Sequence, residues 1–319
     1  MPNPTPSDLH VSRPLTNVSV AYMQEASAFI ASNAFPSVPV AKKADQYYVW
    51  DRGDWNRVQA RERAPGTESA GGGWRVSTDA YLAIKYAFHQ DISDDDYANA
   101  DSEFGLDSAA SEYCSHQLLL KKEDLWISKF FVTGVWGTEV SLSGTAQWSD
   151  YGSASVPFSD FQTAIVAMKK KTGYKPNTLV LSLEVWSKLK NHPTFLERIK
   201  YTQTGFVSPE LLARAAEVDR VLIAEGIKNT AIEGATESNS FFAGKHALLL
   251  YVPSRPGLRT PSAGYTFAWT GLLGAEAGSS RVKRFRMEEI ESNRVEGEMA
   301  FDQKMVGADL GYMILNAVA

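Results

Sequence analysis

The residue types that most often catalyse reactions are scattered along this chain of 319 residues. The five histidines share no spacing that would gather them around one centre, and they are His10, His89, His116, His192 and His246. The chain contains neither a GxSxG nucleophile motif nor an HExxH metal motif. Structural or surface histidines are therefore the better interpretation, and we expect neither a catalytic residue nor an enzyme.

The densest group of carboxylates is Asp91, Asp94, Asp95 and Asp96, which could hold a hard cation such as Ca²⁺. This group lacks the interleaved glycine and the final glutamate of a calcium loop, and acidic runs ahead of a helix are usually solvated or favoured by the helix dipole. The runs 71–73 (GGG) and 244–246 (GKH) lack the rest of a phosphate-binding motif. We therefore expect no metal and no cofactor.

Composition excludes further classes of site. Cys114 is the only cysteine, so an intramolecular disulfide and a CxxC site are impossible, and we expect a small buried thiol in a helix. The net charge of −5, from 32 basic and 37 acidic side chains, argues against a protein whose main task is to neutralise phosphates. No secretory signal and no apolar run long enough to span a bilayer are visible, so we expect a cytoplasmic chain that contacts no membrane.

The most informative local pattern lies at residues 74–89, where apolar and polar side chains alternate over 16 positions. An extended strand of this length would span about 50 Å. Residues 47–58 are rich in β-formers, and the glycine-rich segment 64–73 between the two limbs is typical of a loose tip. The sequence predicts a long β-hairpin that either folds back on its own domain or reaches a neighbouring subunit. Trp50, Trp55 and Trp74 are its candidate contact residues.

The rest of the chain is a mixture of helices and strands. Residues 15–30 have helical spacing, and residues 108–131 contain no glycine or proline, which predicts a helix capped by Asp107 or Ser108. From residue 158 the pattern becomes α/β, with short buried strands at 178–181, 221–224 and 247–252 and helix caps at Ser182 and Ser208. A second long strand at 294–305 follows the basic segment 281–291, so favourable charge pairs are expected between them.

This order of elements resembles the HK97-like major capsid proteins of tailed bacteriophages. Several short stretches are also similar to that family, and they occur in the family's order across 173–312: GYKPNTLVL (173–181), VW (185–186), HP (192–193), RIKYT (198–202), VDRV (218–221), NTA (229–231), LLYVP (249–253), PSAGYTF (261–267), EG (296–297) and DLGY (309–312). Each stretch alone is a modest signal. The first third of the chain resembles the family in architecture only.

The resemblance implies an α+β, HK97-like capsid fold divided as follows: an N-terminal arm (1–45), an extended E-loop hairpin (46–90), a spine helix with the first part of the P-domain (91–157), an α/β A-domain (158–277), the second part of the P-domain (278–306) and a C-terminal strand that returns to the A-domain (307–319). It further implies a subunit that forms hexamers and pentamers in an icosahedral shell, assembled in the host cytoplasm. The shell would enclose double-stranded DNA through non-specific interior contact. Separate scaffolding, portal and decoration proteins are further expected partners.

Two other interpretations stay open at this point. One is an encapsulin, a bacterial compartment shell of the same fold; the other is an α/β enzyme with a site in 158–277. The shell interpretation assigns subunit contacts to aromatic and charged residues of the two predicted hairpins, namely Trp50, Arg52, Trp55, Arg57, Arg61, Arg63, Trp74, Arg284, Arg286, Glu296 and Glu298. Some relatives cross-link through an E-loop lysine, but no lysine lies between Lys43 and Lys85, so we expect no such bond.

Overall fold

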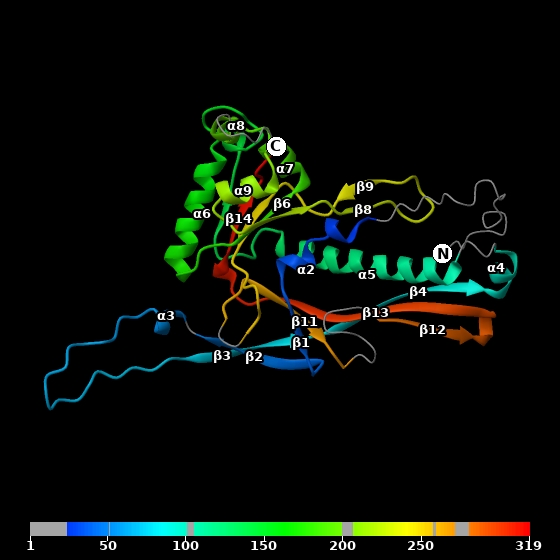
Figure 1. Cartoon of the computed structure of the whole chain (residues 1–319), viewed down its shortest axis with the longest axis horizontal. Coiled ribbons are helices and arrows are strands. Elements are labelled where there is room, and N and C mark those ends of the chain that lie inside the picture. The colour runs from blue at the N-terminus through cyan, green and yellow to red at the C-terminus, as the bar shows by residue number, and fades with distance from the viewer. Residues whose placement is uncertain (1–23, 51, 101–104, 200–206, 258–259, 272–280) are drawn as a thin grey trace.

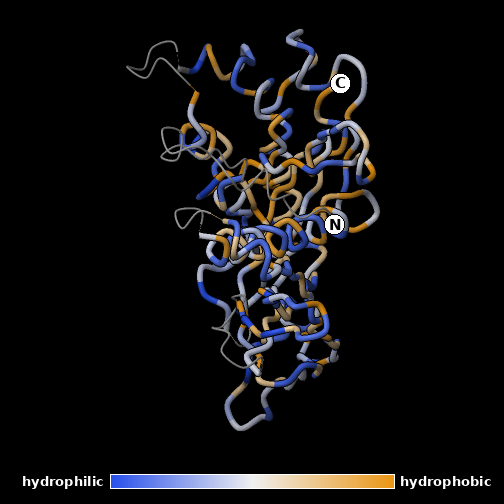
Figure 2. Tube along the Cα trace, turned by 90° about the vertical axis from the view of Figure 1, so that its right-hand side faces the viewer, coloured by the Kyte–Doolittle hydropathy of each residue, from blue (hydrophilic) through white to orange (hydrophobic). Residues whose placement is uncertain are grey.

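A computed structural model describes residues 24–50, 52–100, 105–199, 207–257, 260–271 and 281–319. Figure 1 shows an elongated molecule in which a compact unit of helices and a short sheet stands on a long sheet, while a ribbon projects at one end. Figure 2, a side view, shows hydrophobic residues gathered in the middle of the molecule. The first part of the predicted helix 15–30 lies outside the described residues. None of the described helices is both long and apolar enough to cross a membrane.

The long sheet is built around β13 (Ser292–Met305). Strand β4 (Ile84–Ser93) runs antiparallel along one edge of β13. The other edge is shared by β12 (Arg281–Met287) and β11 (Gly264–Trp269), and β1 (Ser37–Val40) adds to β11 in parallel. A short 3₁₀ turn, η5 (Glu288–Ile290), joins β12 to β13. The predicted C-terminal hairpin is thus confirmed, and its register places Arg281 opposite Glu298 and Lys283 opposite Glu296.

The long helix α5 (Leu106–Phe130) lies across one face of this sheet, as Figure 1 shows. A Cβ added to Gly297 of β13 would lie 3.1 Å from Leu118 Cδ1 and 3.2 Å from Cys114 Cβ, so the helix rests directly on the strand backbone. Cys114 is buried at this contact, as expected. The predicted caps are wrong, because the helix starts after Gly105, whose left-handed backbone favours glycine. Helix α4 (Asp94–Asn99) precedes it.

The short sheet has the strand order β5 (Glu139–Ser141), β14 (Gly311–Leu315), β10 (Ala247–Leu250), β6 (Thr178–Ser182) and β7 (Arg220–Ala224). The helices of this unit are α6 (Pro157–Thr172), α7 (Leu183–Leu189), α8 (Pro193–Ile199) and α9 (Pro209–Ala215). Ser182 and Ser208 cap α7 and α9 through their side chains, as predicted. Pro193 occupies the first position of α8, where its missing N–H costs no helical hydrogen bond. The 3₁₀ turns are η4 (Gly144–Ala146) and η6 (Ala308–Leu310).

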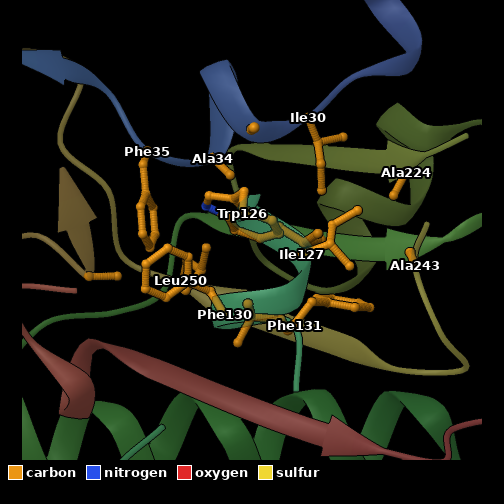
Figure 3. Close-up of a cluster of buried hydrophobic side chains, with 14 of the residues drawn as sticks. Ile30, Ala34, Phe35, Trp126, Ile127, Phe130, Phe131, Ala224, Ala243 and Leu250 are labelled. Carbon is orange, nitrogen blue, oxygen red and sulfur yellow. The ribbon is translucent and has the colours of Figure 1, made fainter. Parts of the chain in front are cut away.

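One hydrophobic core joins the two units (Figure 3). The segment with η2 (Ala26–Ala28) and α2 (Ala31–Ala34) lies over the end of α5, where the ring of Phe35 packs 5.5 Å from Trp126 and 4.8 Å from Phe130. Leu250 of β10 enters the same core. Buried Glu123 of α5 accepts a 2.8 Å hydrogen bond from the backbone N–H of Ala31, which fixes this segment on the helix.

The projecting ribbon consists of β2 (Ala44–Trp50) paired with β3 (Val76–Leu82), with the short helix α3 (Arg52–Trp55) following β2. The expected single strand over 74–89 is wrong, because the chain breaks at Ala83 and continues as β4 in the long sheet. The N–H of Ala83 donates to Lys43 O at 2.8 Å, which closes the ribbon at this point. The limb 47–58 likewise stays extended only as far as Trp50.

A second, shorter ribbon was not predicted. It pairs β8 (Ile227–Asn229) with β9 (Asn239–Phe241) and lies beside α5 in Figure 1. Lys228 of β8 forms a 2.9 Å ion pair with Asp124 of α5. The side-chain amide of Gln24 donates to the backbone carbonyl of Ile227 and accepts from its backbone N–H, each at 2.8 Å. The N-terminal segment, this ribbon and α5 are therefore tied together.

Candidate assembly interface

The carboxylates of the Asp91–Asp96 run turn to separate partners. Asp91 accepts two hydrogen bonds from Arg294 at 2.7 and 2.8 Å, and those bonds lower the pKa of Asp91. Asp94 pairs with Arg286, and Asp96 completes a capping box at the start of α4. In the part of the chain that the structure describes, no three His, Cys, Asp or Glu side chains gather as a metal site would require. The run therefore fastens α4 to the end of the long sheet.

Ser155 and His192 form a buried pair that resembles a nucleophile and its base, since Ser155 Oγ lies 3.1 Å from His192 Nε2. The other ring nitrogen, Nδ1, lies 2.7 Å from Thr194 Oγ1, so both ring nitrogens of His192 have side-chain partners within the chain. Burial also lowers the pKa of His192, which keeps the ring neutral. Ser155, His192 and Thr194 thus form a largely buried hydrogen-bonded network, in which a threonine stands where a catalytic triad has a carboxylate.

The projecting ribbon has one face packed on the body of the subunit. Tyr47 and Tyr81 lie against Phe267 of β11, with ring centroids 5.3 and 4.6 Å apart. The N–H of Leu82 donates to the carboxylate of Asp302 at 3.0 Å. Neighbouring residues of a strand point to opposite faces, so Tyr48, next to Tyr47, belongs to the opposite face. The base of the ribbon is thus fixed, and its other face is left uncovered by the residues that the structure describes.

The uncovered face carries large aromatic side chains. Trp50, Trp55 and Trp74 pack together, with centroid distances of 4.7 Å for Trp50–Trp74, 6.2 Å for Trp50–Trp55 and 6.5 Å for Trp55–Trp74. Trp55 and Trp74 are nevertheless each 55% exposed, and Tyr48 is 65% exposed. The structure brings together the tryptophans that the sequence pattern singled out. An apolar patch of this kind on a projecting element is a candidate contact surface, and its role in contact stays a prediction.

The predicted arginines of this hairpin lie in different surroundings. Arg52 forms a 2.8 Å ion pair with Asp309 of η6 in the same chain. Arg57 lies 3.9 Å from Asp54, which is held more closely by Arg75 at 2.9 Å. Arg61 and Arg63 are exposed in the loop that follows, where Arg63 donates to Thr67 O. Of these residues, Arg57, Arg61 and Arg63 remain accessible to a partner.

The charged residues of the C-terminal hairpin are largely satisfied within the chain. Arg284 pairs with Asp107 at 2.7 Å, and Glu296 lies 3.4 Å from Lys283. Arg286 binds Asp94 through both of its terminal nitrogens. These pairs fasten β12 to α4, α5 and β13. They are partly exposed, and a contact with a neighbour through them stays a prediction.

Glu298 is the exception, because its side chain is fully buried in the chain. It receives Lys85 from β4 together with Arg281 at 2.6 Å and Lys283 at 2.8 Å from β12. Burial would raise the pKa of Glu298, but the hydrogen bonds from Lys283, Lys85 and Arg281 lower it to about 2. Glu298, predicted to contact a neighbouring subunit, is thus buried within its own subunit, where it joins three strands of the long sheet.

No known family model matches the chain. Its sequence is 27% identical over 312 residues to the major capsid protein of Burkholderia phage BcepMu, with 94% of each chain covered. It is 26% identical over 313 residues to the major capsid protein of Pseudomonas phage JBD67, with 96% of each chain covered. Both similarities include the N-terminal third of the chain, where no short stretch resembling the family was found in the sequence.

Solved structures with the same fold include a phage-related protein from Bordetella bronchiseptica, with a TM-score of 0.70, 23% identity and 93% of each chain covered. The capsid protein of cyanophage P-SCSP1u superposes with a TM-score of 0.63 at 13% identity, covering 97% of this chain and 93% of the other. The chain is therefore similar along almost its whole length to tailed-phage major capsid proteins, and it has the HK97-like capsid fold.

Proposed function

We propose that this chain is the major structural subunit of a bacteriophage capsid, and that its copies assemble into an icosahedral shell of hexamers and pentamers around double-stranded DNA. The observation that carries the proposal is the near-complete mutual coverage with major capsid proteins at 26–27% identity. The fold agrees with it, because the molecule is elongated and carries an arm whose aromatic side chains are exposed. The protein would reside in the virion after assembly in the host cytoplasm, and its contact with DNA would be non-specific.

The proposed division of labour follows the described elements. The ribbon β2–β3 with its loop would be the E-loop, and α5 with the long sheet would be the spine helix and P-domain. The short sheet and α6 to α9 would form the A-domain that surrounds the capsomer axes. The segment that precedes β2 would be the N-terminal arm. Scaffolding, portal and decoration proteins would be further partners of the shell.

The subunit contact that we propose is the uncovered face of the ribbon, placed against a second copy of the chain. Exposed Trp55, Trp74 and Tyr48 would supply apolar area, and Val58, which is 93% exposed, would add to it. Arg57, Arg61 and Arg63 would surround this area with charge and favour one orientation. A closed shell needs contacts of this heterologous kind, in which one surface of a copy meets a different surface of the next.

Assembly can be tested by expressing the chain alone and examining it by size-exclusion chromatography and negative-stain electron microscopy. Shells, aberrant shells or free hexamers and pentamers are expected. A uniform small oligomer that forms no higher assembly when concentrated would contradict the proposal.

The contact itself can be tested with the double variant Trp55→Ala, Trp74→Ala. It should fold with an unchanged thermal midpoint but lose most of its particle yield, since interface tryptophans often each contribute about 2 kcal/mol or more to binding. Val166→Ala is a matched control, because Val166 is 66% exposed on α6 and lies outside the ribbon. Equal particle yields from the double variant and the control would exclude this face as the main contact.

A further inference from the structure

Asp309 lies where the two units of the subunit meet. It belongs to η6, which follows the end of β13 in the long sheet and precedes β14 in the short sheet. A Cβ placed on Gly137 would come within 2.2 Å of Asp309 Oδ1, so the carboxylate is closely enclosed on that side. The backbone around Gly137 therefore restricts the position of the Asp309 side chain.

The two oxygens of Asp309 bind cations from different parts of the chain. Lys171, at the end of α6, lies 2.6 Å from Oδ1 and also donates to Gly137 O at 2.7 Å. Arg52 of α3 lies 2.8 Å from Oδ2. Lys171 thus binds one carboxylate oxygen from the body, and Arg52 binds the other oxygen from the ribbon side.

The Arg52–Asp309 pair lies at the opposite end of the ribbon from its base. The base is fixed to the long sheet by Tyr47, Tyr81 and the Leu82–Asp302 hydrogen bond. Arg52 lies beyond the last paired residue of β2, Trp50, and adjoins the tryptophan cluster through Trp55 of the same short helix. With fixed points at the base and at α3, the ribbon has a defined angle to the body.

We propose that Asp309 is a positioning residue for assembly, which holds Arg52 in the free subunit and thereby presents the aromatic face of the ribbon at a set angle. The effect on assembly rests on the proposed shell function, whereas the Arg52–Asp309 contact itself lies within a single subunit. The pair is partly solvent-exposed, so it contributes little to the stability of the fold. The ion pair instead affects the orientation of the ribbon. A few-fold change in the fraction of subunits with the ribbon in the binding orientation changes the rate of assembly by a similar factor.

The orientation can be measured by double electron–electron resonance on free subunits labelled at Ser69→Cys in the loop and Ser153→Cys in the compact unit. Both positions are exposed, whereas the native Cys114 is buried and would not react. Arg52→Gln removes the ion pair, Arg52→Lys retains a cation, and Lys171→Gln removes the other cation without touching the ribbon. The labelled protein is kept at a concentration at which chromatography shows single subunits, and assembly of each unlabelled variant is followed by light scattering.

Arg52→Gln should broaden the distance distribution and slow assembly by a factor of about five, with an unchanged thermal midpoint. Arg52→Lys should recover most of both effects, and Lys171→Gln should leave the distribution narrow. An unchanged distribution in Arg52→Gln would overturn the proposal, and so would equal broadening in Lys171→Gln, which would indicate a disturbed junction. If the unsubstituted chain never assembles, the proposed function fails, while the distance measurement still decides the role of Asp309.

Discussion

The carboxylate of Glu298 has more cations around it than it can neutralise, because Lys85, Arg281 and Lys283 all approach it. Glu298→Gln would leave these cations facing a neutral amide. Lys85 and Lys283 are partly exposed and can turn toward water, so we expect a loss of about 1–3 kcal/mol in the free energy of unfolding at pH 7. Glu288→Gln is the matched control, since its side chain is 84% exposed and should change stability by less than about 0.5 kcal/mol.

The same substitution has a predicted pH dependence. The pKa of Glu298 is about 2 in the folded chain and near 4.5 when unfolded, so the unfolded state takes up the proton first. The stabilisation by Glu298 is complete above about pH 5 and is lost as the pH falls toward 2. Urea titrations of free subunits from pH 7 to pH 3 should therefore show the difference between the wild type and Glu298→Gln shrinking. A difference that stays constant across this range would contradict the assigned pKa.

Sequence patterns predicted pairs between the strands at the C-terminus but not the burial of one of their members. The opposite charges of segments 281–291 and 294–305 were sufficient to expect charge pairs between the two strands, and Arg281–Glu298 is one of them. The third cation, Lys85, comes from a strand more than 200 residues earlier, and only the three-dimensional sheet brings it to Glu298. Asp309 was missed for the same reason, since both of its cations are distant in sequence.

At the scale of elements, the contact of α5 with β13 depends on the absence of a side chain at Gly297. Gly297→Val would force branched carbons into Leu118 and Cys114, whose atoms already lie within 3.1–3.2 Å of an added Cβ. We expect a loss of about 1–3 kcal/mol, measured as a lower urea midpoint. Gly73→Val is the control, because a Cβ at Gly73 meets no atom within 4 Å. Equal midpoints for the two variants would show that the helix can move away from the strand without cost.

Element types were predicted more reliably than element ends. Alternation over 74–89 correctly indicated extended chain, but a pattern of period two continues unchanged where the chain changes partners, as it does at Ala83. Strand β3 belongs to the ribbon, and β4 belongs to the long sheet. The start of α5 immediately after Gly105 was missed because a glycine before a helix has no side chain that could be recognised as a cap. The three tryptophans singled out in the sequence do cluster, since this needs only that the hairpin form, while their role as contact residues stays a prediction.

At the scale of the whole molecule, the ribbon also determines which covalent chemistry between subunits is available. No lysine lies between Lys43 and Lys85, and both of these flank the ribbon rather than its loop. The projecting loop therefore offers no amine that could form an isopeptide bond with a neighbour. Assembled particles boiled in denaturant should give the band of an intact single chain near 35.1 kDa on a gel. A ladder of covalent multimers would show that another lysine is used.

When subunits associate without covalent bonds, the specificity of their contacts comes from complementary charge and shape. Arg57, with its side chain 63% exposed, and exposed Arg61 lie on the projecting end of the molecule, and the carboxylate that approaches Arg57 among the described residues, Asp54, is 3.9 Å away. If they meet acidic groups on a second copy, then Arg57→Glu, Arg61→Glu places like charges at the contact, which is expected to slow association and weaken binding.

The double variant should keep the wild-type thermal midpoint as a free subunit, because neither arginine contributes to the core. Its particle yield should fall at least about tenfold, the effect of a loss of roughly 1.4 kcal/mol in binding. Raising the salt concentration should narrow the gap to the wild type, because screening weakens interactions between exposed charges. Arg255→Glu reverses an exposed charge outside the ribbon and serves as the control. Unchanged yield of the double variant would show that the ribbon associates through its aromatic face alone, with the arginines left in solvent.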